Sequence, residues 1–268
     1  MKGFILSLRS EFYKSRKTAG FWSAVILPLV LCLLVAYNFN RNTGNKVLPP
    51  MLLWIKFSGF ILGVMGAFLL PMLIVFISYS INSIEHKADT WKSIFSLPIP
   101  KLAIYAAKYV YAILLVFLCL LLFLSLTLGL GSLMGHINPD LKFGDFDITT
   151  YLTAIYIKLF LSSLAILSIQ FLLSLLFRDF LKPMGIGFIA TITGIIAVNQ
   201  KWSYNDFFPY SFPVLAMQSI AGPRKPPLMG IMVLPEVDIF THEVLVSFII
   251  AAIVFLLGFF IVQRKSVK

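Results

Sequence analysis

The sequence predicts an all-α integral membrane protein with six transmembrane helices, an N-terminal amphipathic interfacial helix, and both termini in the cytoplasm. Of its 268 residues, 59% are hydrophobic and only 12% are charged, with a mean hydropathy of +0.93. Such a composition is typical of membrane proteins. The long apolar runs are continuous and lack the alternation of lipid-facing strands, which favours helices over a β-barrel. We expect one transmembrane domain, residues 1–268.

The first 19 residues combine basic and apolar side chains at helical spacing. The apolar members expected on one face are Phe4, Ile5, Leu8 and Phe12. The basic members expected on the opposite face are Lys2, Arg9, Arg16 and Lys17. This pattern predicts an amphipathic helix in the membrane interface over residues 1–19. The alternative is a basic, partly disordered leader.

Six apolar runs follow, each long enough to cross a bilayer, whose hydrocarbon core of about 30 Å needs roughly 20 residues of helix. They extend approximately over Phe21–Tyr37, Phe57–Ile81, Ile104–Leu133, Leu152–Phe177, Pro183–Val198 and Val244–Val262. Two lysines fall within them. Lys108, near the start of the third run, is expected to extend its ammonium group to the lipid headgroups. Lys158, one to two turns into the fourth run, is a candidate contact for substrate or lipid.

Small residues in two of the runs predict close helix packing. The second run carries Gly59, Gly63, Gly66 and Ala67. The fifth carries Gly185, Gly187, Ala190 and Gly194. Both faces are expected to pack against neighbours, either within the bundle or at a subunit interface.

The distribution of lysine and arginine predicts cytoplasmic termini, because cytoplasmic segments of membrane proteins are enriched in these residues. With this orientation the inner side holds 14 of the 22 basic residues and four of the 11 acids. The overall charge of +11 is then explained by topology and by contact with anionic lipid, so no nucleic-acid partner is expected.

The link between the second and third runs, residues 82–101, contains the polar stretch EHKADTWKSIFSLPIPK. Asn82 and Glu85 have the spacing of a helix-capping pair, and Pro98 and Pro100 are expected to end the helix that follows. One face of that helix is predicted to carry Trp91, Ile94 and Phe95. An apolar face rimmed by charges predicts a docking element for a partner. The alternative is an interfacial helix whose Trp91 anchors in the headgroups.

The segment before the last run, residues 199–243, combines aromatic residues and prolines in stretches too short to span a membrane. It is predicted to form helices that dip into the outer leaflet or lie on it. The aromatic residues that would shape an outer gate are Phe207, Phe208, Tyr210 and Phe212. The alternative is an interfacial cap in which the same side chains only anchor the fold.

The sequence gives little support for a catalytic function. The chain lacks the G-x-x-x-x-G-K-[ST] pattern of a phosphate-binding loop, and its histidines are dispersed, so no metal site is expected. Cys32 and Cys119 lie in different runs and are expected to be buried free thiols. Asp140, Asp145 and Asp147 are expected in a solvated outer loop. We therefore expect a protein that is no enzyme and binds no cofactor.

The chain resembles the permease subunits of type-2 ATP-binding-cassette (ABC) exporters, and most closely those of lantibiotic or bacteriocin immunity and export systems. The resemblance rests on the basic leader with SEFYKSRKT, on TWKSIFSLPIPK after the second run, and on Lys108 shortly afterwards. It implies a multi-pass protein of the bacterial cytoplasmic membrane, paired as a homodimer or with a similar permease. It also implies two copies of a separate ATPase subunit, which would bind the ATP and Mg.

In that family the link after the second span packs against the ATPase. Carried onto this sequence, the docking residues are Glu85, Asp89, Thr90, Trp91, Ile94 and Phe95, with Lys14 and Lys17 nearby. The expected function is ATP-driven outward movement of an amphipathic peptide, drug or lipid-like substrate. The alternatives are a secondary transporter, which would ordinarily need intramembrane ionisable residues for coupling, and a non-transporting membrane scaffold or sensor.

Overall fold

The structure is a computed structural model that describes residues 2–43, 49–88, 90, 98–220, 234 and 236–264. All regular elements in these ranges are helical, which confirms the predicted all-α class, whereas the orientation of the termini stays a prediction. The main elements are α1 (Lys2–Ser15), α2 (Ala19–Thr43), α3 (Pro50–Val64), the π-helical segment η1 (Met65–Leu69), α4 (Leu70–Ala88), α6 (Lys101–Ile137), α7 (Thr149–Leu176), α8 (Leu181–Asn199), α9 (Phe212–Ile220) and α10 (His242–Arg264). Single 3-10 turns are η2 (Pro139–Leu141), η3 (Phe143–Asp145), η4 (Asn205–Phe207) and η5 (Pro209–Ser211).

Six helical stretches of the described chain are long and apolar enough to cross a membrane, which confirms the predicted number. They are Ala19–Asn42, Pro50–Ala88, Lys101–Ile137, Thr149–Leu176, Leu181–Asn199 and His242–Arg264. Several extend past the predicted boundaries. At about 1.5 Å per residue, α6 is roughly 55 Å long and exceeds the hydrocarbon core of a bilayer.

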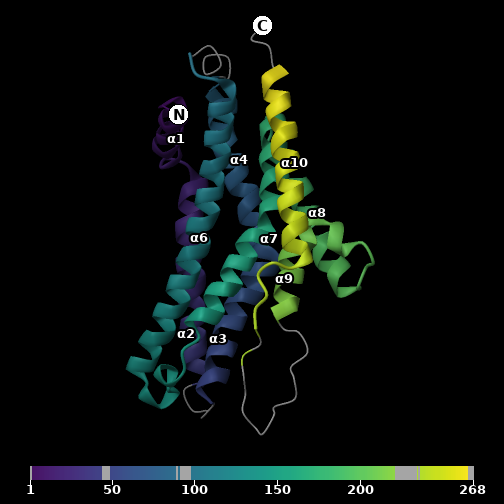
Figure 1. Cartoon of the computed structure of the whole chain (residues 1–268). Coiled ribbons are helices and arrows are strands. Elements are labelled where there is room, and N and C mark those ends of the chain that lie inside the picture. The colour runs from purple at the N-terminus through teal and green to yellow at the C-terminus, as the bar shows by residue number, and fades with distance from the viewer. Residues whose placement is uncertain are drawn as a thin grey trace.

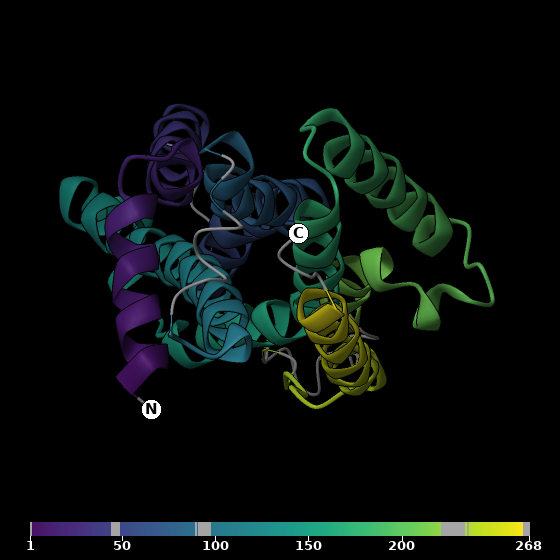
Figure 2. The ribbon, with the colours of Figure 1, turned by 90° about the horizontal axis from the view of Figure 1, so that it is seen from above.

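The helices form an elongated bundle in which α1, the end of α4, the start of α6 and the end of α10 lie at the same end (Figure 1). We call this the α1 end and the opposite one the far end. Seen from above, α1 lies across the direction of the long helices, and α8 runs obliquely at the periphery (Figure 2). Helix α4 packs against α2, α7 and α8, and α7 packs against α10 and α9, so α4 and α7 form the centre.

The faces of α1 differ from the sequence expectation. Its buried face is polar and consists of Ser7, Glu11 and Ser15, at intervals of four residues. Phe12 is 44% exposed, and the guanidinium of Arg16 lies 5.5 Å from the centre of its ring. The predicted separation of apolar and basic side chains is therefore wrong here. The helix uses its polar side to contact the bundle and exposes a mixed aromatic and basic side.

Small residues pack closely within the bundle at some positions and face away from it at others. Gly59 and Gly63 of α3 have no neighbour within 4 Å of a built Cβ, so they face away from the bundle. Gly66 lies against Met217 of α9. Gly194 of α8 allows a close approach to η5, since a Cβ there would lie 2.5 Å from a backbone carbonyl oxygen. Gly194 thus helps to hold the segment that follows α8.

Aromatic packing closes the far end. The ring of Trp54 in α3 lies edge-on to Phe143 of η3, with ring centres 4.9 Å apart. Its indole Nε1 donates a hydrogen bond to the carbonyl oxygen of Phe143 at 2.9 Å. Both side chains are buried. The indole satisfies a backbone acceptor while its ring fills the core, so α3 is tied to the link between α6 and α7.

Candidate functional site

Two acidic and two basic side chains from three helices meet at the α1 end. Glu11 and Lys14 come from α1, Glu85 from the last turn of α4, and Lys108 from the second turn of α6. Lys108 Nζ lies 2.8 Å from Glu11 Oε2 and 2.7 Å from Glu85 Oε2. Lys14 Nζ lies 3.2 Å from Glu11 Oε1 and 3.1 Å from Glu85 Oε1. Each lysine bridges both carboxylates, and we call these four residues the charge cluster.

Three members of the charge cluster are almost completely removed from solvent. The exposed fractions are 3% for Glu11 and 1% each for Glu85 and Lys108. Burying a charge is unfavourable unless an opposite charge compensates it, and the two formal positive and two formal negative charges balance. The contact between Lys108 and Glu85 Oε2 has the distance of an ion pair without hydrogen-bond geometry. The Lys108 ammonium also donates to the carbonyl oxygen of Ile81 at 3.4 Å.

Local sequence explains how α1 brings its carboxylate to this point. Residues four positions apart share a helix face, so Ser7, Glu11 and Ser15 point together toward the bundle. The small serines leave room for a close approach of α1 to α6. Ser15 Oγ and Tyr111 Oη lie 2.5 Å apart in a buried hydrogen bond that fixes the end of α1 on α6.

Lys14 occupies the rim of the charge cluster, with 35% of its side chain exposed. Burial alone would lower the pKa of Lys14, but the carboxylates of Glu11 and Glu85 outweigh it and raise the pKa above the ordinary 10.5. The ammonium therefore stays charged at neutral pH. Its contribution to stability would be lost only as the pH rises through this elevated pKa.

The expectation that Lys108 extends to the lipid headgroups is wrong. Its side chain is buried and faces Glu11 and Glu85 inside the chain. If Lys108 extended to the headgroups, both carboxylates would stay buried without this cation. That penalty exceeds the free energy gained by solvating the ammonium group.

The predicted helix cap at Asn82 is also wrong, because α4 continues without a break to Ala88. The Asn82 side chain is fully buried, and its Nδ2 donates to Ser174 Oγ of α7 at 2.7 Å. One turn later, His86 Nε2 lies 3.1 Å from the carbonyl oxygen of Ser174. These polar contacts attach the last two turns of α4 to the end of α7, so the start of the link is held firmly.

Of the six predicted docking residues, the structure describes Glu85 and Thr90. The Glu85 carboxylate lies in the charge cluster, and its carbonyl oxygen accepts a hydrogen bond from the Thr90 amide at 3.2 Å. Its side chain therefore holds the beginning of the link and is not presented on the surface. The other four predicted docking residues lie outside the described residues: Asp89, Trp91, Ile94 and Phe95.

Lys158 is paired with an acid from another helix. Its side chain is 1% exposed, and Nζ lies 3.3 Å from Glu243 Oε1 in the first turn of α10. Nearby, Ser247 Oγ of α10 donates to the carbonyl oxygen of Leu161 in α7 at 3.0 Å. So buried a side chain does not fit the expected lipid contact, and its ion pair joins α7 to α10. A contact with substrate stays a prediction.

The four predicted gate residues differ in how far their side chains are exposed. Phe207 is 65% exposed, and its ring centre lies 5.9 Å from that of His242 at the start of α10. Tyr210 and Phe212 are buried, and Gln170 Nε2 of α7 donates a hydrogen bond to the Tyr210 hydroxyl. Burial raises the pKa of Tyr210 to about 12. Phe208 is half-buried.

Comparison with known proteins identifies a family. Residues 7–194, well over half of the chain, match the family model described as ABC-2 family transporter protein. The chain has no significant match among curated proteins or solved structures. The matched range contains the whole charge cluster, the link after α4 and most of α8.

Proposed function

The chain belongs to the ABC-2 family of transporter proteins and is a multi-pass permease subunit of an ABC transporter, and we propose that it exports an amphipathic substrate. The observation that carries this proposal is the family match over a chain with six apolar spans. A substrate of this kind, a peptide, drug or lipid-like molecule, fits the resemblance to bacteriocin and lantibiotic immunity permeases. The membrane would be the bacterial plasma membrane.

We propose that the complex contains two ATPase subunits, which bind ATP and Mg, and two permease chains, either identical or similar. The family implies an ABC ATPase partner. The link at residues 82–101 would dock on it through Asp89, Thr90, Trp91, Ile94 and Phe95. Glu85 would act from inside the chain by positioning the start of this link.

The charge cluster would couple movement of the link to movement of the bundle. It joins α1, the last turn of α4 and the second turn of α6 through four contacts of 2.7–3.2 Å. When the two ATPases associate on binding ATP, a displacement of the link would move these three segments together. The six spans would then tilt as a unit and open a path between the two permease chains.

Copurification tests the proposal. The full-length chain, expressed with candidate ABC ATPases of its host, should retain one of them, and ATP hydrolysis by that ATPase should depend on this chain. Transport that continues without any ATPase and follows an ion gradient would indicate a secondary transporter instead. A membrane protein with neither partner nor transport would indicate a scaffold or sensor.

Labelling of single cysteines tests the orientation, in which the α1 end faces the cytoplasm. Cys32 and Cys119 are buried, so both native thiols are expected to react little. In intact cells an impermeant thiol reagent should label a cysteine at Ser203 and spare one at Ser93, because only Ser203 is on the predicted outer side. Permeabilised cells, in which the cysteine introduced at Ser93 becomes reactive, provide the control. Labelling of the cysteine at Ser93 from outside would contradict the proposed orientation.

Single substitutions in the outer segment separate gating from anchoring. Phe207→Ala should lower the transport rate per assembled complex without lowering the amount of folded protein, since this ring is exposed. Tyr210→Ala should reduce the amount of folded protein, because truncating a buried aromatic residue costs about 3–5 kcal/mol. The measurement is transport normalised to purified complex. A normal normalised rate for Phe207→Ala would reject the gate and leave an interfacial cap.

A further inference from the structure

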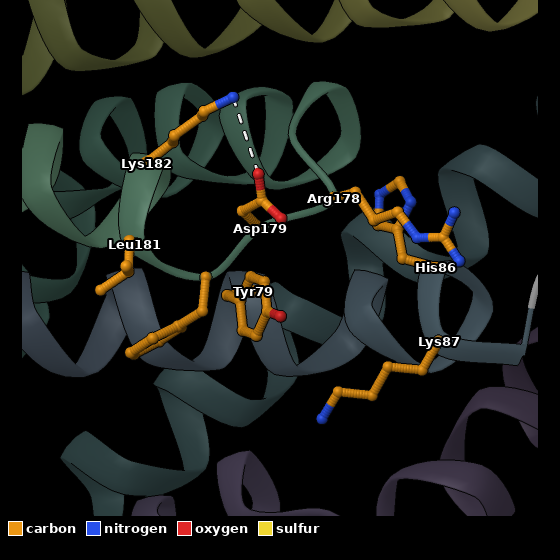
Figure 3. A pocket seen from close by; sticks show the side chains of 8 residues that line it. Tyr79, His86, Lys87, Arg178, Asp179, Leu181 and Lys182 are labelled. Carbon is orange, nitrogen blue, oxygen red and sulfur yellow. Dashed lines mark ion pairs between the residues drawn. The ribbon is translucent and has the colours of Figure 1, made fainter.

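A cleft of about 660 Å³ opens at the α1 end, between the last turns of α4 and the short link from α7 to α8 (Figure 3). Four basic side chains line it, two from α4 and two from the α7–α8 region: His86, Lys87, Arg178 and Lys182. Tyr79 and Phe180 form its aromatic wall, with ring centres 4.9 Å apart. We call this site the basic cleft.

The charges of the basic cleft do not balance. Asp179 is the one acid among the described lining residues, and it pairs with Lys182 at 3.6 Å. Arg178 and Lys87 are exposed, and among the residues that the structure describes no carboxylate lies within ion-pair distance of either. Figure 3 shows Arg178 beside His86 and away from the Lys182–Asp179 pair. An unbalanced cluster of this kind attracts an anion, and a guanidinium suits phosphate through paired hydrogen bonds.

Apolar surface adjoins these charges. Leu176, the last residue of α7, is 44% exposed, and Leu181, the first residue of α8, is 79% exposed. Farther along α8, Ile189 is 66% exposed. Two spans therefore begin or end here with apolar side chains pointing outward beside basic ones. This combination is expected where acyl chains meet headgroups, and basic pockets between helix ends at this level suit anionic lipid headgroups.

We propose that the basic cleft binds the phosphate headgroup of an anionic phospholipid from the leaflet at the α1 end. Arg178 and Lys87 contact the phosphate, and Tyr79 and Phe180 close the apolar side of the site. The acyl chains lie along the exposed apolar face of α8. This site is separate from the charge cluster, whose cations are already paired within the chain.

Lipid titration of the purified full-length chain tests the site. The probes are short-chain phosphatidylglycerol and, as the neutral counterpart, short-chain phosphatidylcholine. The double variant Lys87→Gln and Arg178→Gln should bind phosphatidylglycerol at least about tenfold more weakly, because two charge-assisted contacts are lost. Lys87→Arg with Arg178→Lys keeps the charge and should retain most of the binding. Binding of phosphatidylcholine should not change.

The matched control is Arg9→Gln with Lys17→Gln, which removes two exposed charges from the same end of the molecule outside the basic cleft. Equal loss of phosphatidylglycerol binding in the control and the cleft variant would overturn the proposal in favour of diffuse surface charge. Displacement of the lipid by inorganic phosphate at equal concentration would overturn it in favour of a free phosphate site. Unchanged lipid binding, with loss of a copurified ATPase, would assign the cleft to a protein interface.

Discussion

Lys108→Met should be the most destabilising single substitution at the α1 end, lowering the free energy of unfolding by about 3–5 kcal/mol. The change removes one cation that lies within 2.8 Å of two carboxylates and leaves Lys14 as their one partner within the charge cluster. Two buried carboxylates would then share a cation at the rim. Thermal unfolding of the detergent-purified chain, with the yield of monodisperse protein, measures the effect.

Two further variants make this result specific. Lys17→Met removes an exposed lysine close to α1 and should leave the unfolding temperature nearly unchanged. Combining Lys108→Met with Glu11→Gln removes the surplus negative charge and should recover part of the loss. Wild-type unfolding of Lys108→Met would show that the charge cluster adds no stability. Failure of Glu11→Gln to improve on Lys108→Met would show that the buried carboxylates are not the cause.

The largest expected effect on assembly comes from Trp91→Ala combined with Phe95→Ala. Truncating an aromatic anchor at an interface typically costs about 2 kcal/mol or more, so the pair should weaken ATPase binding by roughly a thousandfold. The ATPase should no longer copurify, while membrane insertion and the amount of permease stay normal. The measurement is the ratio of ATPase to permease after affinity purification.

A matched pair of aromatic residues at the other side of the molecule controls for loss of exposed surface. Trp202 is 48% exposed and Phe240 is 68% exposed, and both belong to the predicted outer segment. Trp202→Ala with Phe240→Ala should leave the ratio of ATPase to permease unchanged. If the Trp91 and Phe95 variant keeps its ATPase as well as this control does, the link is not the docking element.

The transmembrane helices could be predicted because span formation depends on a local property, the length of an apolar run. The charge cluster could not, because it depends on three segments meeting. Lys108 and Glu11 are 97 positions apart in the sequence, and nothing local to Lys108 distinguishes a buried lysine from one that reaches the headgroups. A weak signal did exist in α1, where Ser7, Glu11 and Ser15 recur on one face. An acid flanked by small polar residues at that spacing favours a helix–helix contact over a lipid contact.

Asn82 shows why polar residues near a span end are easily misread. In the sequence it begins a polar stretch, and asparagine is a residue type preferred at the N-cap of a helix. In the structure its amide is satisfied by Ser174 on α7, so α4 needs no solvent at this point and continues for six more residues to Ala88. The docking face of Trp91, Ile94 and Phe95 remains a prediction from the sequence and the family.

The burial of the charge cluster determines how the α1 end responds to ionic strength. Salt screens exposed charges over a Debye length of about 10 Å at 0.1 M and about 3 Å at 1 M, but it reaches buried pairs poorly. Glu11, Glu85 and Lys108 are nearly inaccessible to ions, whereas the basic cleft and the Lys182–Asp179 pair are open to solvent. Washing membranes with concentrated salt would thus strip lipid headgroups from the basic cleft while α1 stays attached to α4 and α6.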